Sequence, residues 1–86
     1  MPELSRFFGI VITMYFRDHV PPHFHARYGE HEAKFGTETG NVMEGSLPRR
    51  ARGLVQEWHL LHAAELAAAW QDVQNRVSPS KIEPLE

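Results

Sequence analysis

The sequence predicts an α+β fold in which a small antiparallel sheet of three to four strands packs against one long C-terminal helix. Three observations support this prediction. Residues 7–16 are rich in β-branched and aromatic side chains, and residues 23–36 alternate around a Gly-X pair typical of tight hairpins. Residues 48–76 repeat apolar side chains at helical spacing. A chain of 86 residues supports one hydrophobic core, so residues 1–86 are expected to form a single domain.

The first strand is expected over residues 7–16. Successive side chains of a strand point to opposite faces, and the even positions here are all apolar, so they should face the core. These positions are Phe8, Ile10, Ile12, Met14 and Phe16. The opposite face is mixed and includes Tyr15. The pair Pro21-Pro22 predicts that a loop follows the strand.

Two further strands are expected over residues 23–28 and 31–36, joined by a two-residue turn at Gly29-Glu30. The resulting cross-strand pairs are Tyr28–His31, Arg27–Glu32, Ala26–Ala33, His25–Lys34 and Phe24–Phe35. One face is then apolar and expected to be buried; it carries Phe24, Ala26, Tyr28, Ala33 and Phe35. The other face is polar and expected to be exposed; it carries His23, His25, Arg27, Glu32 and Lys34.

A short fourth strand is expected over residues 41–44 and the helix over residues 48–76. Proline is tolerated in the first helical turn, which suits Pro48, and Pro79 lies just beyond the predicted end. The apolar stripe of the helix consists of Leu54, Val55, Trp58, His62, Leu66, Ala69 and Val73. The last segment, residues 79–86, holds two apolar side chains and is expected to dock on the domain.

Composition excludes several classes of protein. Without cysteine, the chain forms no disulfides and offers no thiolate to a metal or a redox reaction. The first residues lack the layout of a signal peptide, and the longest apolar run is too short to cross a bilayer. We therefore expect a cytoplasmic protein with no membrane contact and no cofactor. A net charge of −2 disfavours nucleic-acid binding over the whole surface but leaves a local basic patch open, and the small size leaves homo-oligomerisation open.

The first candidate site consists of Asp18, His19, His23 and His25. His23 and His25 alternate onto one strand face, where two imidazoles can share a metal ion with Asp18 or His19 as the third ligand. Alternatively, His19, His23 and His25 are candidate catalytic residues, because imidazole titrates near neutral pH. Strands often carry histidine on a solvated face, so a polar, partner-binding surface is favoured and no metal is expected.

The second candidate site is the start of the helix, where Arg49, Arg50 and Arg52 lie in the first turn. Positive charges there oppose the helix dipole by about 0.3–1 kcal/mol each, so an anionic group is expected nearby. This group is a phosphate, an acidic protein partner or a carboxylate of the chain itself, such as Glu44. The candidate anion- or partner-binding residues are Arg27, Lys34, Arg49, Arg50 and Arg52.

The helix carries two further features. His62 lies near the centre of the apolar stripe, with His59 at its edge, and is expected to be a core histidine bonded to Glu65 or to a backbone carbonyl. The back of the helix is a smooth surface of mostly small residues, favoured here because alanine is the best helix former, with a self-association seam as the alternative. This surface consists of Leu60, Ala63, Ala64, Ala67 and Ala68.

Four stretches carry a family resemblance: residues 5–12 (SRFFGIVI), 22–29 (PHFHARYG), 45–51 (GSLPRRA) and 81–85 (KIEPL). Together with Trp58 and Trp70 of the helix, they are spread over nearly the whole chain and resemble the bacterial family known as domain of unknown function 4160. The resemblance implies no catalytic residues. It implies a neighbouring gene for a small protein of the domain of unknown function 2442 family, in pairs discussed as toxin–antitoxin modules. Val20 stands where the family commonly has a proline.

The expected function is therefore that of a protein-binding component of a toxin–antitoxin-like two-gene module, with the small protein of the second family as its partner. The alternative from another class is a hydrolase acting on RNA through His19, His23 and His25, with the arginines holding phosphate. A DNA-binding regulator ranks lower, because no helix-turn-helix is visible and the net charge is negative.

Overall fold

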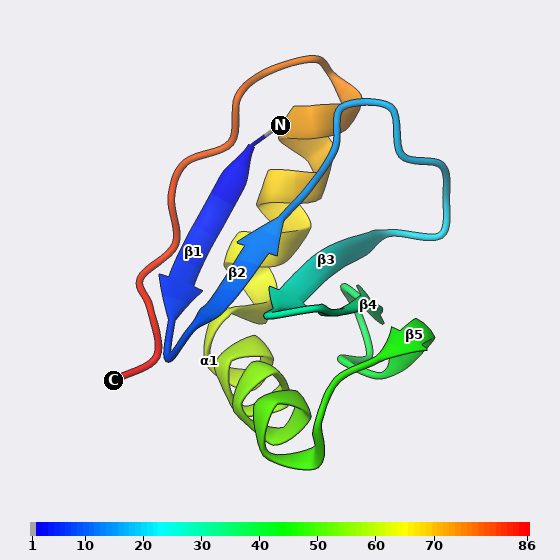
Figure 1. Cartoon of the computed structure of the whole chain (residues 1–86). Helices are drawn as coiled ribbons and strands as arrows, with labels where there is room; N and C mark the ends of the chain where they lie inside the picture. The colour runs from blue at the N-terminus through cyan, green and yellow to red at the C-terminus, as the bar shows by residue number, and fades with distance from the viewer. Residues whose placement is uncertain (1) are drawn as a thin grey trace.

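The computed structural model describes residues 2–86, which form one five-stranded antiparallel sheet and one long helix (Figure 1). The elements are β1 (Glu3–Phe7), β2 (Ile10–Thr13), β3 (His23–Tyr28), β4 (His31–Gly36), β5 (Val42–Ser46) and α1 (Arg49–Gln74). The sheet has the strand order β1-β2-β3-β4-β5, so each strand pairs with its neighbour along the chain. The predicted α+β architecture is confirmed, whereas the predicted count of three to four strands is wrong because the sheet has five.

A hairpin of β1 and β2, which turns at Phe8-Gly9, replaces the single strand that was predicted over residues 7–16. Phe8 and Gly9 have positive φ angles of 49° and 81°, which turn the chain tightly and pair Phe7 with Ile10. The turn also changes which side chains are buried: Phe8, predicted in the core, is 57% exposed, and Phe7 is buried. The predicted core positions that are fully buried are Ile10, Ile12 and Met14.

The hairpin of β3 and β4 has the predicted register. Phe24 lies opposite Phe35, both side chains are fully buried, and their rings stack with centroids 5.5 Å apart. Gly29 has a φ of 59° in the connecting turn. Tyr28 was predicted to be buried but is 38% exposed, because it is the last residue of β3 and lies beside that turn.

β5 occupies residues 42–46, shifted toward the helix relative to the predicted 41–44. It pairs with β4, with an irregularity in register between Lys34 and Phe35. Gly45 lies opposite Ala33 with a φ of 77°. A Cβ atom at this position would collide with the backbone oxygen of Glu32, so β4 and β5 approach closely only because residue 45 is glycine.

α1 crosses one face of the sheet (Figure 1). Its buried residues are Ala51, Val55, Trp58, His59, Leu66, Ala69, Trp70 and Val73. Trp58 is fully buried, with its ring centroid 5.4 Å from that of Phe7 and 5.9 Å from that of Phe24. The backbone leaves helical geometry at His62, where φ is −128°, so α1 is kinked near its centre. Within residues 2–86, no helix combines the length and the apolar character needed to cross a bilayer.

The C-terminal tail runs beside β1, at the edge of the sheet (Figure 1). The amide of Ile82 donates a hydrogen bond of 2.8 Å to the carbonyl of Leu4, and the indole N–H of Trp58 donates one of 2.8 Å to the carbonyl of Glu83. The side chains of Ile82 and Leu85 are buried. The tail thus closes one sheet edge and provides a hydrogen-bond acceptor for the largest core side chain.

Candidate functional site

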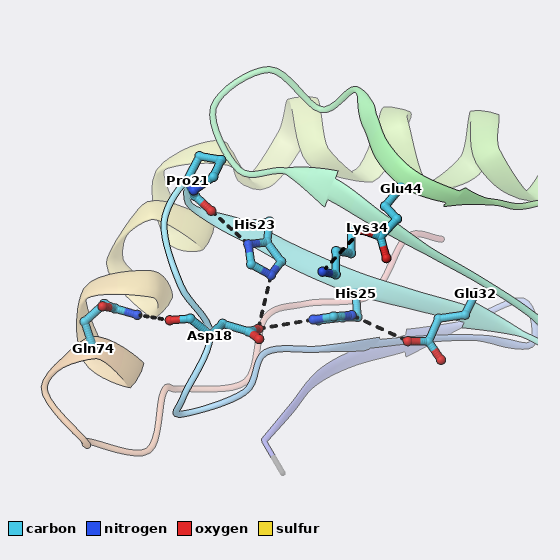
Figure 2. Close-up of polar contacts among 8 residues, drawn as sticks. All are labelled: Asp18, Pro21, His23, His25, Glu32, Lys34, Glu44 and Gln74. Carbon is cyan, nitrogen blue, oxygen red and sulfur yellow. Dashed lines mark hydrogen bonds and ion pairs between the residues drawn. The ribbon is translucent and has the colours of Figure 1, made fainter.

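The connection between β2 and β3 brings Asp18 against the two histidines of β3 (Figure 2). Asp18 Oδ2 lies 3.3 Å from His23 Nε2 and 3.1 Å from His25 Nε2. His23 and His25 share one face of the strand because they are two residues apart. Gln74, the last residue of α1, donates a hydrogen bond of 3.2 Å to the backbone carbonyl of Asp18 and so ties the connection to the helix.

His23 and His25 are buried, which corrects the prediction that they are exposed, whereas Arg27 and Glu32, predicted on the same face, are exposed. Their side chains are 6% and 9% exposed, and that of Asp18 is 18% exposed. The His23 ring packs against the rings of Trp70 and His25, with distances between ring centroids of 5.5 Å and 5.2 Å. The Tyr15 ring contacts the His25 ring edge-to-face, with ring centroids 4.4 Å apart. The alternation of side chains correctly separated the two faces, but the connection and the helix end cover the part of the polar face that carries the two histidines.

The two histidines differ in the surroundings of the ring nitrogen that points away from Asp18. His23 Nδ1 lies 2.8 Å from the carbonyl oxygen of Pro21, to which it donates. A neutral His23 therefore carries its proton on Nδ1 and a lone pair on Nε2. His25 Nε2 donates a hydrogen bond of 3.1 Å to Asp18 Oδ2, and His25 Nδ1 lies 3.5 Å from a carboxylate oxygen of Glu32 without forming a hydrogen bond. His23 thus has the kind of carbonyl partner that metal-binding histidines usually have, which fixes the tautomer and the ring orientation.

The three inward-facing atoms have the spacing of metal ligands. Asp18, His23 and His25 each offer one ligand atom, and these three atoms all lie within 4.8 Å of one another. Zinc binds imidazole nitrogen and carboxylate oxygen at about 2.0–2.2 Å, so neighbouring ligands of a tetrahedral ion are separated by about 3.3–3.6 Å. The distances from Asp18 Oδ2 to the two Nε2 atoms, 3.3 and 3.1 Å, are close to this value.

A cavity of about 220 Å³ adjoins this cluster. Its walls are formed by Asp18, His19, Val20, Pro21, His23, Lys34, Met43 and Glu44. His19 is exposed at the cavity wall and does not belong to the group of three ligand atoms. Lys34 Nζ lies 3.7 Å from a carboxylate oxygen of Glu44. The cluster of Asp18, His23 and His25 therefore packs against protein at Trp70 and faces this cavity on its open side.

Glu32 and Glu44 are functional candidates whose roles the sequence did not reveal. Glu32 was assigned to Arg27, its partner in the register, but its carboxylate instead lies beside His25. In the predicted register Glu32 is the diagonal neighbour of His25, and diagonal neighbours in a hairpin are also within reach of each other. The register could therefore have predicted this contact. Glu44 was considered as a partner of the arginines, whereas the structure pairs it with Lys34.

The arginines of α1 lie apart from this cavity, since none of them lines it. Arg49, Arg50 and Arg52 are exposed, and no carboxylate of residues 2–86 forms an ion pair with them. Arg27, at the end of β3, is likewise exposed. Of the predicted cationic residues, Lys34 is therefore the one that lines the cavity beside the histidines.

The core histidine of the helix is His59 rather than the predicted His62. His59 is buried and contacts the carbonyl oxygen of Thr37 through Nε2 at 2.6 Å. His62 lies at the kink, is half-buried, and its Nδ1 contacts Glu65 Oε1 at 2.6 Å, so the predicted pairing with Glu65 is confirmed. Neither histidine belongs to the group formed with Asp18.

Comparison with known proteins gives one match. The model of the family described as "Domain of unknown function (DUF4160)" matches residues 9–71, which include the connection, both histidines, Lys34 and most of α1. No curated protein and no solved structure matches the chain. Because the matched segment covers well over half of the 86 residues, the chain belongs to the DUF4160 family.

Proposed function

We propose that this domain binds a divalent metal ion through Asp18, His23 and His25. The observation that supports this proposal is the environment of His23 Nε2. This atom is buried without a hydrogen-bond partner, although it lies only 3.3 Å from a carboxylate oxygen of Asp18. Because Nδ1 donates to Pro21, a neutral His23 has no proton on Nε2, and its lone pair lies close to that negatively charged oxygen.

A positive charge between these two atoms removes the repulsion. A proton on Nε2 would supply this charge, but it would form only an ion pair at 3.3 Å, without the geometry of a hydrogen bond to Asp18. A metal ion needs no such alignment along a single N–H bond, and it would also engage His25 Nε2. Two imidazoles and one carboxylate suit first-row ions such as Zn²⁺.

Three protein ligands leave a tetrahedral ion one position for water or a substrate. Asp18 and His23 both line the cavity of about 220 Å³, so this position is expected to face the cavity. Centres of this open type polarise a bound oxygen and lower the pKa of bound water, whereas structural zinc sites have four protein ligands. The proposed site is therefore one for metal-assisted chemistry, most simply hydrolysis.

Metal titration of the purified, metal-free protein tests this proposal. Zn²⁺ should raise the melting temperature, because an ion present at 100 times its dissociation constant adds about 2.7 kcal/mol to the free energy of unfolding. Asp18→Asn should lower Zn²⁺ affinity at least about 100-fold, because it replaces an anionic ligand by a neutral amide. Asp72→Asn is the matched control, because Asp72 is the other aspartate and lies outside the cluster.

The ligand role also requires a histidine variant that folds. His25→Gln keeps a polar side chain of similar length and should abolish the zinc-dependent rise, whereas His31→Gln, at an exposed position of β4, should retain it. Far-ultraviolet circular dichroism establishes that each variant is folded. A rise in melting temperature that is equal in the parent and in Asp18→Asn would show that zinc binds elsewhere.

We also propose, as a second candidate, that Arg49, Arg50 and Arg52 bind an acidic protein partner in a cytoplasmic toxin–antitoxin-like pair. Their exposure and their lack of ion pairs within residues 2–86 support this reading. Three unpaired cations at the positive end of a helix dipole are locally unfavourable, and an anionic partner would offset this. Arginine is also enriched among the residues that dominate binding at protein interfaces.

Replacing the three arginines by alanine tests the second candidate. The triple variant should melt no lower than the parent, because like charges leave the positive end of the dipole. Its affinity for the product of the neighbouring gene should fall about 30-fold or more, as expected when an interface anchor is lost. Replacing the three arginines by lysine keeps the positive charges but removes the guanidinium groups, so this variant shows whether charge alone is enough for binding. A parent affinity for RNA that falls steeply with salt and depends on the arginines would instead indicate phosphate contacts.

A further inference from the structure

We propose that the open side of the Asp18–His23–His25 centre takes a phosphate group, held between the metal ion and the ammonium group of Lys34. This inference rests on the proposed metal centre and names the chemical class of its ligand. It depends on where Lys34 lies, on the charges that line the cavity, and on the cavity's size.

Lys34 reaches the cavity from the strand that neighbours the two histidines. In the register of β3 and β4 it lies directly opposite His25, and such cross-strand pairs share one face with Cβ atoms about 4.5–5.5 Å apart. Its side chain is 36% exposed and lines the cavity together with Asp18 and His23 (Figure 2). A ligand bound at the open metal position would therefore meet an ammonium group on the adjacent wall.

The charges of the cavity favour an anion only when the metal is present. Asp18 and Glu44 supply two negative charges to its walls, and Lys34 supplies one positive charge. With His19 and His23 neutral, the net charge of the metal-free cavity is therefore negative, whereas a bound divalent ion makes this net charge positive. Glu44 opposes the anion, and its carboxylate lies 3.7 Å from the Lys34 ammonium group. Because the Glu44 side chain is 74% exposed, it is free to turn into solvent.

The size of the cavity limits the ligand to a small group. Its volume of about 220 Å³ lies below the range of about 300–1,000 Å³ that is typical of pockets for drug-sized molecules. Val20 and Met43, which are 75% and 44% exposed, form part of its wall. A single phosphate group matches the charge and the volume, and any larger molecule that carries it would extend outward past these two apolar side chains.

Binding of inorganic phosphate to the protein loaded with one equivalent of Co²⁺ tests the inference, because the visible spectrum of Co²⁺ reports changes in its ligands. Phosphate should change the spectrum of the loaded protein, and calorimetry should detect no phosphate binding to the metal-free protein. Lys34→Met should weaken phosphate binding about tenfold while Co²⁺ still binds. Lys81→Met is the matched control, because Lys81 is the other lysine and forms a similar surface pair with Glu3 at 3.8 Å.

Glu44→Gln provides the opposite test, since removing its negative charge should tighten phosphate binding. Phenyl phosphate, compared with free phosphate, shows whether the group is accepted as part of a larger molecule, and acetate shows whether any small carboxylate suffices. Phosphate binding that is equal with and without metal, or unchanged in Lys34→Met, would overturn the inference. Failure of Co²⁺ to bind would overturn the proposed metal centre as well, whereas Co²⁺ binding without phosphate binding would overturn this inference alone.

Discussion

Trp58→Ala is expected to lower the free energy of unfolding by about 3–5 kcal/mol. Domains of this size have total stabilities of about 4–13 kcal/mol, so much of the variant should be unfolded under mild conditions. The indole is fully buried between the sheet and α1, where it contacts the rings of Phe7 and Phe24. Its loss also leaves the carbonyl of Glu83 without its donor. Urea denaturation followed by far-ultraviolet circular dichroism measures the effect.

Two variants separate core packing from the hydrogen bond. Leu60→Ala changes a residue of the same helix that is 79% exposed, and it should alter stability by no more than about 0.5 kcal/mol. Trp58→Phe retains an aromatic ring in the core but offers no donor to Glu83, so its stability should lie between those of the parent and Trp58→Ala. A loss for Trp58→Ala similar to that for Leu60→Ala would place this indole outside the core.

Gly45→Ala should lower the free energy of unfolding by about 2–5 kcal/mol. At a φ of 77°, any side chain adds about 1–2 kcal/mol of backbone strain. A Cβ atom would also approach the Cα of Ala33 to 3.1 Å and the backbone oxygen of Glu32 still more closely. Since these are backbone atoms of a paired strand, the collision is relieved only by moving β4 away from β5. The same urea experiment measures the loss.

Two other glycines are matched controls for this prediction. Gly29 has a φ of 59° but open space around its Cβ direction, so Gly29→Ala should lose only the strain of about 1–2 kcal/mol. Gly53 lies in α1 with open space around its Cβ direction, and Gly53→Ala should stabilise the protein by about 0.8–1 kcal/mol. Equal losses for Gly45→Ala and Gly29→Ala would mean that β4 and β5 do not approach as closely as described.

The sequence predicted the parts of the fold that follow from local periodicity. The turn at Gly29 and the alternation on both sides of it specified the register that pairs Phe24 with Phe35. The turn at Phe8-Gly9 escaped prediction for a physical reason. Bulky residues rarely adopt a positive φ, so Phe8 looked like part of a continuous apolar strand rather than the first residue of a turn. Missing that turn also concealed β1 and reversed the expected burial of Phe7 and Phe8.

For the candidate site, the sequence identified the residues but not their environment. Asp18, His19, His23 and His25 were named together, and the structure places ligand atoms of Asp18, His23 and His25 within 4.8 Å of one another but leaves His19 outside this group. Alternation along β3 indicates which face carries the histidines, but not whether another segment covers that face. Coverage depends on how the connection containing Tyr15 and Asp18 folds back, which is a long-range property that neither periodicity nor propensity encodes.

The docked tail has a consequence for the order in which the molecule assembles. Each strand of the sheet pairs with the next along the chain, and such local contacts favour rapid folding. The bond between the amide of Ile82 and the carbonyl of Leu4 instead joins segments from opposite ends of the described chain. The entropy cost of closing so long a loop is offset only after both sheet and helix exist to receive the tail. The segment that caps the indole of Trp58 is therefore expected to attach late in folding and to detach early in local unfolding.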